Sequence, residues 1–300
     1  MTRRPDCRAA GVLLVLLATT AAFAAEPPAD VLFEKDLTYG KGGGVELKLN
    51  LSRPMDAAGK KLPCVLVMHG GGWAGGNRAQ HDDITFRFAR AGYVSATIGY
   101  RLAPAHQFPA QVHDVKAAVR FLRANAEKYG IDAQRFGAVG FSAGAHLSMM
   151  LGTTDKDDGL EGDGGSPDQP SKVQAVVAYF GPTDLAATDI PQSVQGILKN
   201  FIGGTAIEKP REYRQASPIT YVSPADAPML LFQGTKDPLV PHTQAYAMVE
   251  AMTRYNIPGR VELLLNAGHG WGEPEIKRTV DSTFAFFDQH LKPKDASAGR

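Results

Sequence analysis

One serine in this sequence lies in a pattern that can activate it for nucleophilic attack. Gly140-Phe141-Ser142-Ala143-Gly144 has the spacing G-x-S-x-G, which is typical of a sharp strand-to-helix turn that exposes a serine hydroxyl. An apolar strand is expected before it, and an Ala- and Met-rich helix over Ala145 to Leu151 after it. A Cβ at either glycine would obstruct the close crossing of strand and helix. The sequence therefore predicts that Ser142 is a nucleophile, and not an idle residue in a glycine-rich connection.

A serine hydroxyl needs a base within hydrogen-bond reach, and the base needs an acid that orients it. Asp237 follows the apolar run Met229 to Phe232, and His269 follows the run Val261 to Leu265. Both come after Ser142, in the order Ser, Asp, His that is expected when the partners lie on loops beyond later strands. We therefore predict that Ser142, His269 and Asp237 form a catalytic triad.

Other histidines and acids are placed less well for these roles. His242 begins a helical pattern, His290 lies in the last helical pattern, and Asp226 precedes its strand instead of following it. His146 follows Ser142 on the same predicted helix, and we expect it to pack beneath the serine.

A triple-glycine segment could stabilise a developing negative charge on oxygen. His69-Gly70-Gly71-Gly72-Trp73 follows the apolar run Cys64 to Met68. Glycines let bare backbone N–H groups converge on a substrate carbonyl, although a flexible loop without this role has the same composition. We expect His69 to orient the loop through hydrogen bonds. The N–H groups expected to donate belong to Gly71, Gly72 and Ala143.

Three further residues are candidates for contact with substrate. Trp73 adjoins the triple glycine and either forms a pocket wall or packs structurally. Asp184 follows the run Val173 to Phe180, so it lies at the same edge of the sheet; capping a helix N-terminus is its alternative role. Trp271 lies two residues beyond His269, and the same two roles are open for it: forming a pocket wall or packing structurally.

These residues need a scaffold that brings distant loops together. Apolar runs recur between amphipathic helical patterns, which predicts right-handed βαβ crossovers and a parallel sheet covered on both faces. The helical patterns span Pro109 to Ala126, Gln244 to Tyr255 and Glu275 to Leu291. The expected strands span Cys64 to Met68, Tyr93 to Ile98, Phe136 to Gly140, Val173 to Phe180, Met229 to Phe232 and Val261 to Leu265.

An antiparallel hairpin is expected before this alternation. Val31 to Tyr39 and Val45 to Ser52 read as two strands joined across a glycine-rich turn. In the second strand Val45, Leu47, Leu49 and Leu51 share one face, and Glu46, Lys48 and Asn50 share the other, which predicts one wet face. With no internal repeat and no linker, residues 25 to 300 read as one α/β domain of three layers.

The first 24 residues have the pattern of a signal peptide. Three arginines (Arg3, Arg4 and Arg8) precede an apolar stretch, Gly11 to Thr20, and an A-x-A cleavage site follows it at Ala22-Phe23-Ala24. The apolar stretch is too short to span a bilayer, so we expect no integral span after cleavage. A retained N-terminal anchor is the competing reading. The expected location is secreted or periplasmic.

Composition excludes several classes of partner and site. A net charge of +1 gives no sign of nucleic acid as a partner. Cleavage would leave Cys64 as the remaining cysteine, which excludes an internal disulfide, and no metal-ligand spacing of Cys and His is present. The acidic stretch Asp155 to Asp168 fails the calcium-loop pattern because Gly159 occupies a ligand position, so we expect a solvated surface loop.

The motifs together resemble those of the α/β-hydrolase esterases. The resemblance is carried by His69-Gly70-Gly71-Gly72-Trp73, by Tyr100-Arg101-Leu102-Ala103-Pro104, by Gly140 to Gly144, and by the late Asp237 and His269. It covers roughly Val31 to Leu291 and is closest to hormone-sensitive-lipase-like esterases and secreted acetyl-xylan and feruloyl esterase-like enzymes.

The resemblance implies a fold, a reaction and a substrate class. It implies a mostly parallel sheet and a serine carboxylic-ester hydrolase that needs no cofactor. Hormone-sensitive-lipase-like enzymes usually carry a helical N-terminal cap, whereas the residues between Ala25 and the first buried strand have the pattern of strands. We therefore expect no large cap and an open pocket. An open pocket and export favour short-acyl esters, such as acetyl or feruloyl esters of plant polysaccharide. A serine peptidase of the prolyl-oligopeptidase type and a non-catalytic binding module are the alternatives.

Overall fold

The computed structural model describes residues 26–292 of the chain. The predicted signal peptide, residues 1–24, lies outside this range. Among the described residues, no helix combines the length and apolar character needed to cross a membrane.

Eight strands form one sheet in the described part of the chain, in the order β1-β2-β4-β3-β5-β6-β7-β8. The β1–β2 and β2–β4 pairs are antiparallel, and the other five neighbouring pairs are parallel. The mostly parallel sheet and the N-terminal hairpin predicted from the sequence are therefore confirmed. The strands are β1 (Val31–Gly42), β2 (Val45–Pro54), β3 (Leu62–Met68), β4 (Val94–Ile98), β5 (Ile131–Phe141), β6 (Ala175–Tyr179), β7 (Met229–Gly234) and β8 (Gly259–Leu264).

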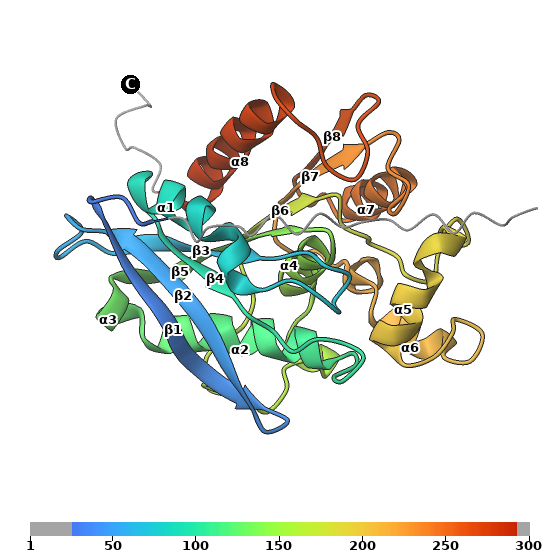
Figure 1. Ribbon diagram of the computed structural model, residues 1–300, viewed down its shortest axis with the longest axis horizontal. Coiled ribbons are helices and arrows are strands. Elements are labelled where there is room, and N and C mark those ends of the chain that lie inside the picture. The colour runs from blue at the N-terminus through green and yellow to red at the C-terminus, as the bar shows by residue number, and fades with distance from the viewer. Residues whose placement is uncertain (1–25, 293–300) are drawn as a thin grey trace, which may run out of the picture.

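Helices cover both faces of this sheet and give the three layers expected (Figure 1). Helices α1 and α8 pack on one face, and α2, α4 and α7 pack on the other. The α-helices are α1 (Asp82–Arg90), α2 (Ala110–Ala124), α3 (Ala126–Tyr129), α4 (Ala143–Thr153), α5 (Gln195–Ile202), α6 (Pro210–Gln215), α7 (Thr243–Arg254) and α8 (Glu275–Leu291). The described part of the chain also has four 3-10 helices: η1 (Arg78–His81), η2 (Lys156–Asp158), η3 (Gln192–Val194) and η4 (Pro218–Tyr221).

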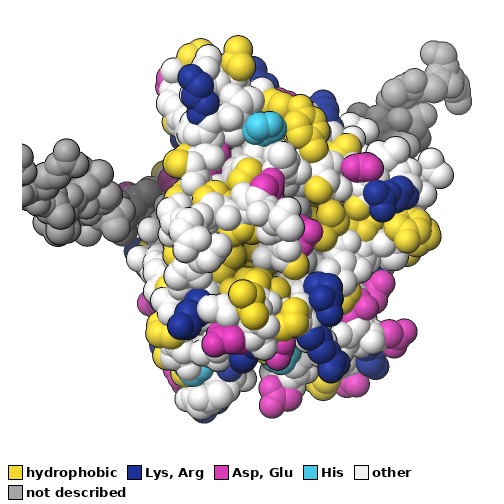
Figure 2. Space-filling model, turned by 90° about the vertical axis from the view of Figure 1, so that its right-hand side faces the viewer, with side chains coloured by type: hydrophobic (Ala, Val, Ile, Leu, Met, Phe, Trp, Pro, Cys, Tyr) yellow, Lys and Arg dark blue, Asp and Glu magenta, His cyan; other side chains and the backbone are white. Residues whose placement is uncertain are grey.

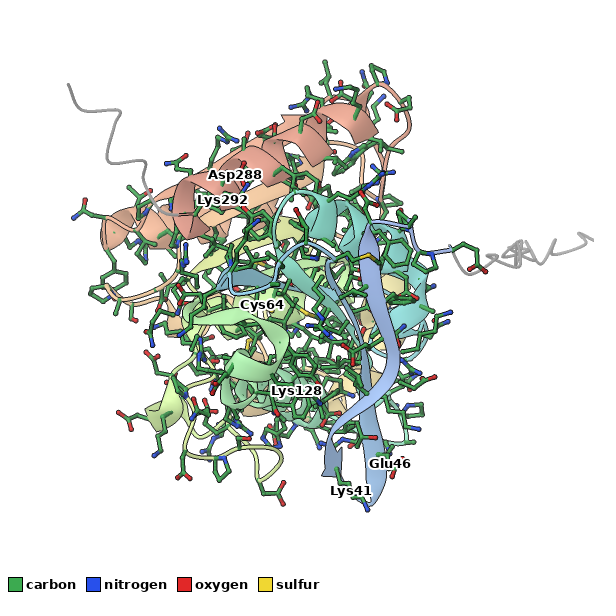
Figure 3. All side chains as sticks on the ribbon, turned by 90° about the vertical axis from the view of Figure 1, so that its left-hand side faces the viewer. Lys41, Glu46, Cys64, Lys128, Asp288 and Lys292 are labelled. Carbon is green, nitrogen blue, oxygen red and sulfur yellow. The ribbon has the colours of Figure 1, made fainter. Side chains whose placement is uncertain are left out.

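The continuous apolar run of β3 is explained by burial on both sides. Val65 and Val67 point into the layer under α1 and α8, whereas Cys64, Leu66 and Met68 point into the layer under α2 and α4. Each such side chain contributes roughly 1.5–3 kcal/mol on full burial. The interior position of Cys64 is visible in Figure 3, and burial raises the pKa of its thiol, as expected of a cysteine that acts as a small hydrophobe.

The wet face predicted for β2 is wrong at Asn50, which is 3% exposed. Helix α1 covers this part of the strand and supplies polar partners: Asn50 Nδ2 donates to Asp82 Oδ1 at 3.0 Å. Thr97 Oγ1 donates to the same oxygen at 2.9 Å. A buried amide is tolerated when its hydrogen bonds are made, so alternation alone could not tell this buried face from a solvated one.

A long connection between β6 and β7 lies beyond the carboxyl edge of the sheet and carries η3, α5, α6 and η4 (Figure 1). Helix α5 buries Leu198, Phe201 and Ile202 along one side, which is why this short segment folds against the body of the protein. No helix precedes β1 in the described residues.

Most of the acidic stretch after α4 is exposed, as expected of a surface loop, but Glu161 anchors it to the protein. Glu161 accepts hydrogen bonds from Lys116 Nζ at 2.7 Å and from Arg120 Nη1 at 2.5 Å. Both cations belong to α2 and are almost fully buried, at 0% and 2% side-chain exposure. Buried charges persist only when they are paired, so Glu161 is required by the helix beneath it.

We predict that Glu161→Gln destabilises the fold by about 2–4 kcal/mol, because it leaves Lys116 and Arg120 without their counter-charge. Glu250→Gln is the control; it breaks an exposed pair with Arg254 worth about 0–1 kcal/mol. Burial raises the pKa of Glu161, but the hydrogen bonds and charges of Lys116 and Arg120 outweigh it and hold the pKa below its ordinary value of 4.5. The stabilisation is therefore present above pH 4.5 and is lost as the pH falls through the lower folded-state pKa.

Urea unfolding at pH 7 and at pH 3 measures both effects. The difference in the free energy of unfolding between wild type and Glu161→Gln should be smaller at pH 3 than at pH 7. The control variant Glu250→Gln should differ from wild type by no more than about 1 kcal/mol at pH 7. Equal stability of wild type and Glu161→Gln at pH 7 would contradict this account.

Candidate active site

Ser142 lies at the sharp turn between β5 and α4, with φ of +53°. The two flanking glycines are required by close backbone contacts. A Cβ on Gly140 would lie 2.2 Å from the carbonyl oxygen of Gly144, and a Cβ on Gly144 would lie 2.3 Å from that of Met68. The turn is therefore possible only with glycine on both sides, and it presents the serine at the carboxyl edge of the sheet.

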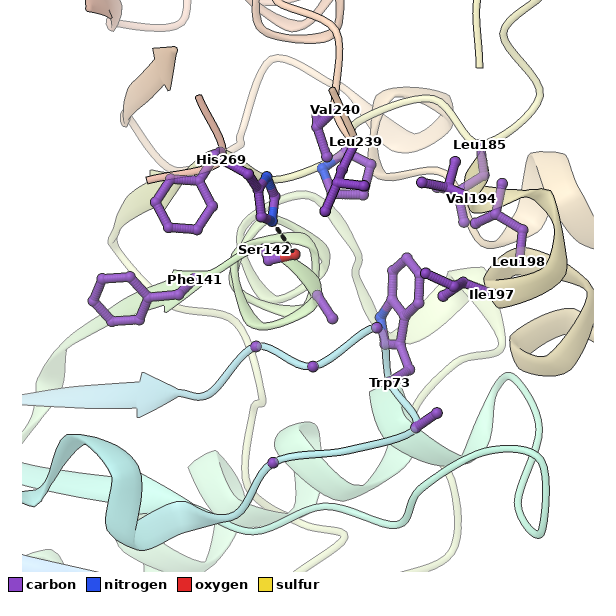
Figure 4. A pocket seen from close by; sticks show the side chains of 18 of the residues that line it. Trp73, Phe141, Ser142, Leu185, Val194, Ile197, Leu198, Leu239, Val240 and His269 are labelled. Carbon is purple, nitrogen blue, oxygen red and sulfur yellow. Dashed lines mark hydrogen bonds between the residues drawn. The ribbon is translucent and has the colours of Figure 1, made fainter. Parts of the chain in front are cut away.

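The structure brings together the three residues predicted as a triad. His269 Nε2 lies 2.9 Å from Ser142 Oγ, a contact drawn as a dashed line in Figure 4. On the other side of the ring, Nδ1 lies 2.7 Å from Asp237 Oδ2. Because a carboxylate only accepts, Nδ1 carries the hydrogen and Nε2 is free to accept the serine hydroxyl proton.

Asp237 is held as an ionised, immobile acceptor. Its side chain is 0% exposed, and it receives hydrogen bonds from the backbone N–H groups of Leu239 at 2.8 Å and Val240 at 3.0 Å. Gln233 Nε2 donates to it as well, at 3.0 Å. Burial alone would raise the pKa of Asp237, but the hydrogen bonds from His269, Val240 and Leu239 outweigh it and lower the pKa below its ordinary value.

The residues considered as rivals lie elsewhere. Asp226 pairs with Lys172 Nζ at 3.1 Å, and the ring of His290 packs against Phe286. His146 is fully buried beneath the elbow, as expected, and burial lowers its pKa to about 4.

The triple-glycine loop follows β3 and adopts a conformation that explains its composition. Gly71, Gly72 and Trp73 are three consecutive residues with positive φ, at +111°, +59° and +57°. A Cβ on Gly71 would lie 2.4 Å from the carbonyl oxygen of Gly75, so a side chain there has no room. The loop lines the same cavity as Ser142 and Ala143.

Hydrogen bonds hold this loop at both ends. The Tyr100 hydroxyl donates to the carbonyl oxygen of His69 at 2.8 Å, and the two rings stack with centroids 4.3 Å apart. The His69 ring nitrogen Nδ1 is 2.7 Å from the carbonyl oxygen of Gly70, to which it donates. At the far end, the N–H of Ala103 donates to the carbonyl oxygen of Trp73 at 2.8 Å. This geometry supports the orienting role expected for His69.

Trp73 has both of the roles considered for it. Its ring lines the cavity and stacks on Phe201 of α5, with centroids 4.1 Å apart and planes at 9°. Its indole N–H donates to His146 Nδ1 at 3.3 Å, and His146 Nε2 donates to the carbonyl oxygen of Ala216 at 2.6 Å. The loop is therefore tied to α4 and to the β6–β7 connection as well as to its own strand.

A cavity of about 640 Å³ opens beside Ser142, on the face seen in Figure 2, where hydrophobic side chains gather around a hollow. In Figure 4 Trp73 and Ile197 lie on one side of Ser142, and Phe141 lies on the other. Among residues 26–292, no Asp, Glu, Lys or Arg side chain lines this cavity. Its apolar lining includes Trp73, Phe141, Phe180, Leu185, Ile190, Val194, Ile197, Leu198, Leu239 and Val240.

Two of the suggested substrate residues lie outside this cavity. Asp184 does not line it; its carboxylate accepts a hydrogen bond from the N–H of Ala186 at 2.9 Å and so closes a turn, and no helix begins there. Trp271 lines a second, smaller cavity behind the His269 loop and donates its N–H to Thr279 Oγ1 at 3.2 Å.

Sequence reasoning missed Phe180 and α5. Phe180 has φ of +45°, and its ring lies 4.7 Å from that of His269, centroid to centroid. A strained conformation of a bulky residue leaves no mark in the sequence. Helix α5 could have been found, because Leu198, Phe201 and Ile202 follow helical spacing within the β6–β7 connection.

The sheet, the elbow and the late Asp and His define the α/β-hydrolase fold. The sequence matches the BD-FAE family over residues 49–252, more than half of the chain, and the chain belongs to this family. In the described residues, no group of three or more His, Cys, Asp or Glu is arranged to hold a metal ion.

Curated relatives include two Mycobacterium tuberculosis proteins. Esterase LipC is 34% identical over 79% of this chain, and esterase LipQ is 32% identical over 72%. These alignments cover 60% and 52% of the relatives, so the chain spans little more than half of their length.

Solved structures support the same fold. A carbohydrate esterase from gut microbiota, in truncated form, superposes with a TM-score of 0.78 and 26% identity, over 88% of this chain and 98% of its own. Esterase Est2 of Thermogutta terrifontis, solved with propionate bound, gives a TM-score of 0.73 and 25% identity, over 87% of this chain and 96% of its own.

We predict that a fluorophosphonate probe labels Ser142, and that Asp237→Asn slows the labelling by roughly 10²–10⁴-fold at pH 7. The amide can donate to Nδ1 and so favour the tautomer in which Nε2 carries the hydrogen and cannot accept the serine proton. Labelling rates followed by intact mass measure the effect, and Asp184→Asn is the matched control. Unchanged labelling of Asp237→Asn would show that the aspartate does not orient the imidazole.

Proposed function

We propose that this protein is a serine carboxylic-ester hydrolase that works through an acyl-enzyme. One observation carries the proposal: the hydrogen-bonded chain from Asp237 through His269 to Ser142 ends beside a glycine loop in a cavity without charged side chains. The esterase names of LipC and LipQ support the same reaction class.

In the first half-reaction Ser142 Oγ attacks the ester carbonyl carbon while its proton moves to His269 Nε2. The carbonyl π electrons move to the oxygen and form a tetrahedral oxyanion. When the oxyanion collapses, the bond to the alcohol oxygen breaks and that oxygen takes the proton from Nε2. Throughout, Asp237 keeps Nδ1–H oriented and stabilises the imidazolium with its negative charge.

In the second half-reaction a water molecule gives a proton to His269 Nε2 and its oxygen attacks the acyl carbon. Collapse of the second oxyanion releases Ser142 Oγ, which recovers the proton, and the acid leaves. No cofactor takes part in either half.

The oxyanion is met by backbone donors in this proposal. Ala143 is the first residue of α4, where an N–H has no acceptor within the helix. The N–H groups of Gly71 and Gly72 are the other donors. One such donor typically contributes about 10²–10³ in rate, because it acts on charge that develops only in the transition state.

The lining of the cavity beside Ser142 supports the proposal that the substrate carries an uncharged acyl group of modest size. Trp73 and Ile197 bound it on the side of α5, where an acyl chain would be enclosed by apolar side chains. Neighbouring structures described as a carbohydrate esterase and as a propionate complex fit a short acyl group on a carbohydrate. We therefore propose short-acyl esters as substrates, with acetyl or feruloyl esters of plant polysaccharide as the natural class.

Export is part of the proposal and rests on the first 24 residues of the sequence. We predict that the protein recovered outside the cytoplasm begins at Ala25, because cleavage follows Ala22-Phe23-Ala24. Intact mass and N-terminal sequencing measure this directly. A protein that begins at Met1 and stays with the membrane fraction would instead support a retained anchor.

The main test assays the mature protein and Ser142→Ala on p-nitrophenyl acetate, longer p-nitrophenyl esters, acetylated xylan and a chromogenic peptide amide. We expect hydrolysis of the acetate and the xylan ester, and a loss of about 10⁴–10⁶-fold in kcat for Ser142→Ala. The substitution removes only an oxygen atom, so circular dichroism should be unchanged.

Three results would contradict the proposal in different ways. Ester turnover that survives in Ser142→Ala would exclude the serine mechanism. Cleavage of the peptide amide alone would identify a peptidase. No turnover that depends on Ser142 with any of the substrates would favour a binding module.

A further inference from the structure

A second cavity of about 270 Å³ lies between α1 and α8, on the other side of the His269 loop from α5. Its floor is the sheet, through Val139 and Tyr179, and its walls come from the two helices and from Trp271. We call it the α1–α8 groove. Its lining residues are Asp83, Ile84, Arg87, Phe88, Val139, Phe141, Tyr179, Phe180, Gly270, Trp271, Ile276, Thr279, Val280, Thr283 and Phe284.

The groove adjoins the candidate active site. Phe141 and Phe180 line both cavities. Phe141 is bonded to Ser142, and the ring of Phe180 lies 4.7 Å from that of His269. An ester held at Ser142 has two substituents that point away from the carbonyl carbon in different directions. One cavity is therefore available for each.

The two cavities differ in polarity. The larger one has no charged lining, whereas the groove carries Asp83 and Arg87 on one rim, one helical turn apart on α1. Both residues are exposed, and neither side chain makes a hydrogen bond or ion pair with any described residue. These two side chains are consequently available to a ligand.

The deeper polar groups of the groove are already satisfied. Thr279 Oγ1 accepts from Trp271 Nε1 and donates within α8. The hydroxyl of Tyr179 is 2.7 Å from Thr283 Oγ1 and donates to the carbonyl oxygen of Thr279. A ligand therefore meets a largely apolar, aromatic interior and finds charged groups only at the α1 rim.

We infer that the α1–α8 groove binds the alcohol half of the ester, and that this alcohol is a hydroxylated ring; the inference rests on the proposed esterase function. A sugar-like ring offers an apolar face to aromatic side chains such as Trp271 and hydroxyl groups to Asp83 and Arg87. An acyl chain would leave both charges unused. The exposed rim, which also includes Ile276 at 41% exposure, leaves room for an alcohol that is part of a larger molecule.

The test compares three acetates that share the acyl group: ethyl acetate, cyclohexyl acetate and an acetylated methyl xyloside. Val280→Trp fills the groove, and Arg87→Gln and Asp83→Asn remove the rim charges. Arg90→Gln is the control, because Arg90 lies on α1 outside the groove in an exposed pair with Asp30. Ile197→Trp narrows the larger cavity and serves as the reciprocal variant.

We expect Val280→Trp to lower kcat/KM for the xyloside ester by more than about tenfold through steric exclusion, with ethyl acetate little changed. Arg87→Gln and Asp83→Asn should each lower kcat/KM for the xyloside ester by about 2- to 10-fold, the range for loss of one net hydrogen bond. Cyclohexyl acetate should respond to Val280→Trp but not to the rim variants. Ile197→Trp should discriminate against hexanoate relative to acetate esters of the same alcohol.

Several outcomes would overturn the inference while leaving the esterase function standing. Equal effects on all three acetates would mean that the groove does not hold the alcohol. Rim variants that leave the xyloside ester unaffected would exclude recognition of hydroxyl groups. Sensitivity of hexanoate esters to Val280→Trp would assign the groove to the acyl chain. If the wild-type protein hydrolyses none of the esters, the esterase proposal itself is refuted.

Discussion

The site depends on one close crossing of backbone, where β5 passes into α4 beside the end of β3. Gly140 and Gly144 approach so closely that neither could carry a side chain, and Gly144 touches the last carbonyl of β3 as well. Ser142 is forced into a strained conformation with positive φ that costs about 1–3 kcal/mol. The backbone N–H of Ser142 donates to the carbonyl oxygen of Tyr179 at 2.9 Å, and the carbonyl oxygen of Ser142 accepts from the backbone N–H of His146 at 3.1 Å. These bonds and the packed sheet hold the strained turn.

Because the elbow is placed against β3, the loop that follows β3 must pass beside the serine. That loop has three successive residues with positive φ and would not keep its shape alone. It is held by Tyr100 and Ala103 from the β4–α2 connection, and by His146 from α4 through the indole of Trp73. Burial keeps the His146 ring neutral, so it can accept from Trp73 and donate to Ala216 at the same time. The donors proposed for the oxyanion are thus positioned by three separate parts of the chain.

The convergence of Ser142, His269 and Asp237 could be predicted because the signals are local. Ser142, Asp237 and His269 each follow an apolar strand within a few residues, and a parallel sheet brings such positions to one edge. Other positions were harder to predict, because their surroundings depend on how distant parts of the chain pack together. Asn50 has the pattern of a solvated position until α1 covers it.

The same reason explains the other differences. Glu161 meets Lys116 across 45 residues of sequence, and no acidic composition reveals such a partner. The positive φ of Phe180 arises where β6 ends against the His269 loop, so it also depends on packing. Sequence reasoning was therefore strongest where a residue's position follows from the strand that precedes it, and weakest where its role follows from what packs upon it.

The absence of charged side chains from the larger cavity has a consequence for a hydrolase of this kind. In the proposed mechanism, charge that develops at Ser142 is met by backbone dipoles and by His269, whose partner Asp237 has a side chain that is 0% exposed. Such interactions are stronger in an apolar setting than in water. Hydrolysis turns a neutral ester into an acid that ionises at neutral pH, and an apolar cavity without a cation binds a carboxylate poorly. In the proposed reaction, the same lining that favours the ester and its transition state therefore also favours release of the acid.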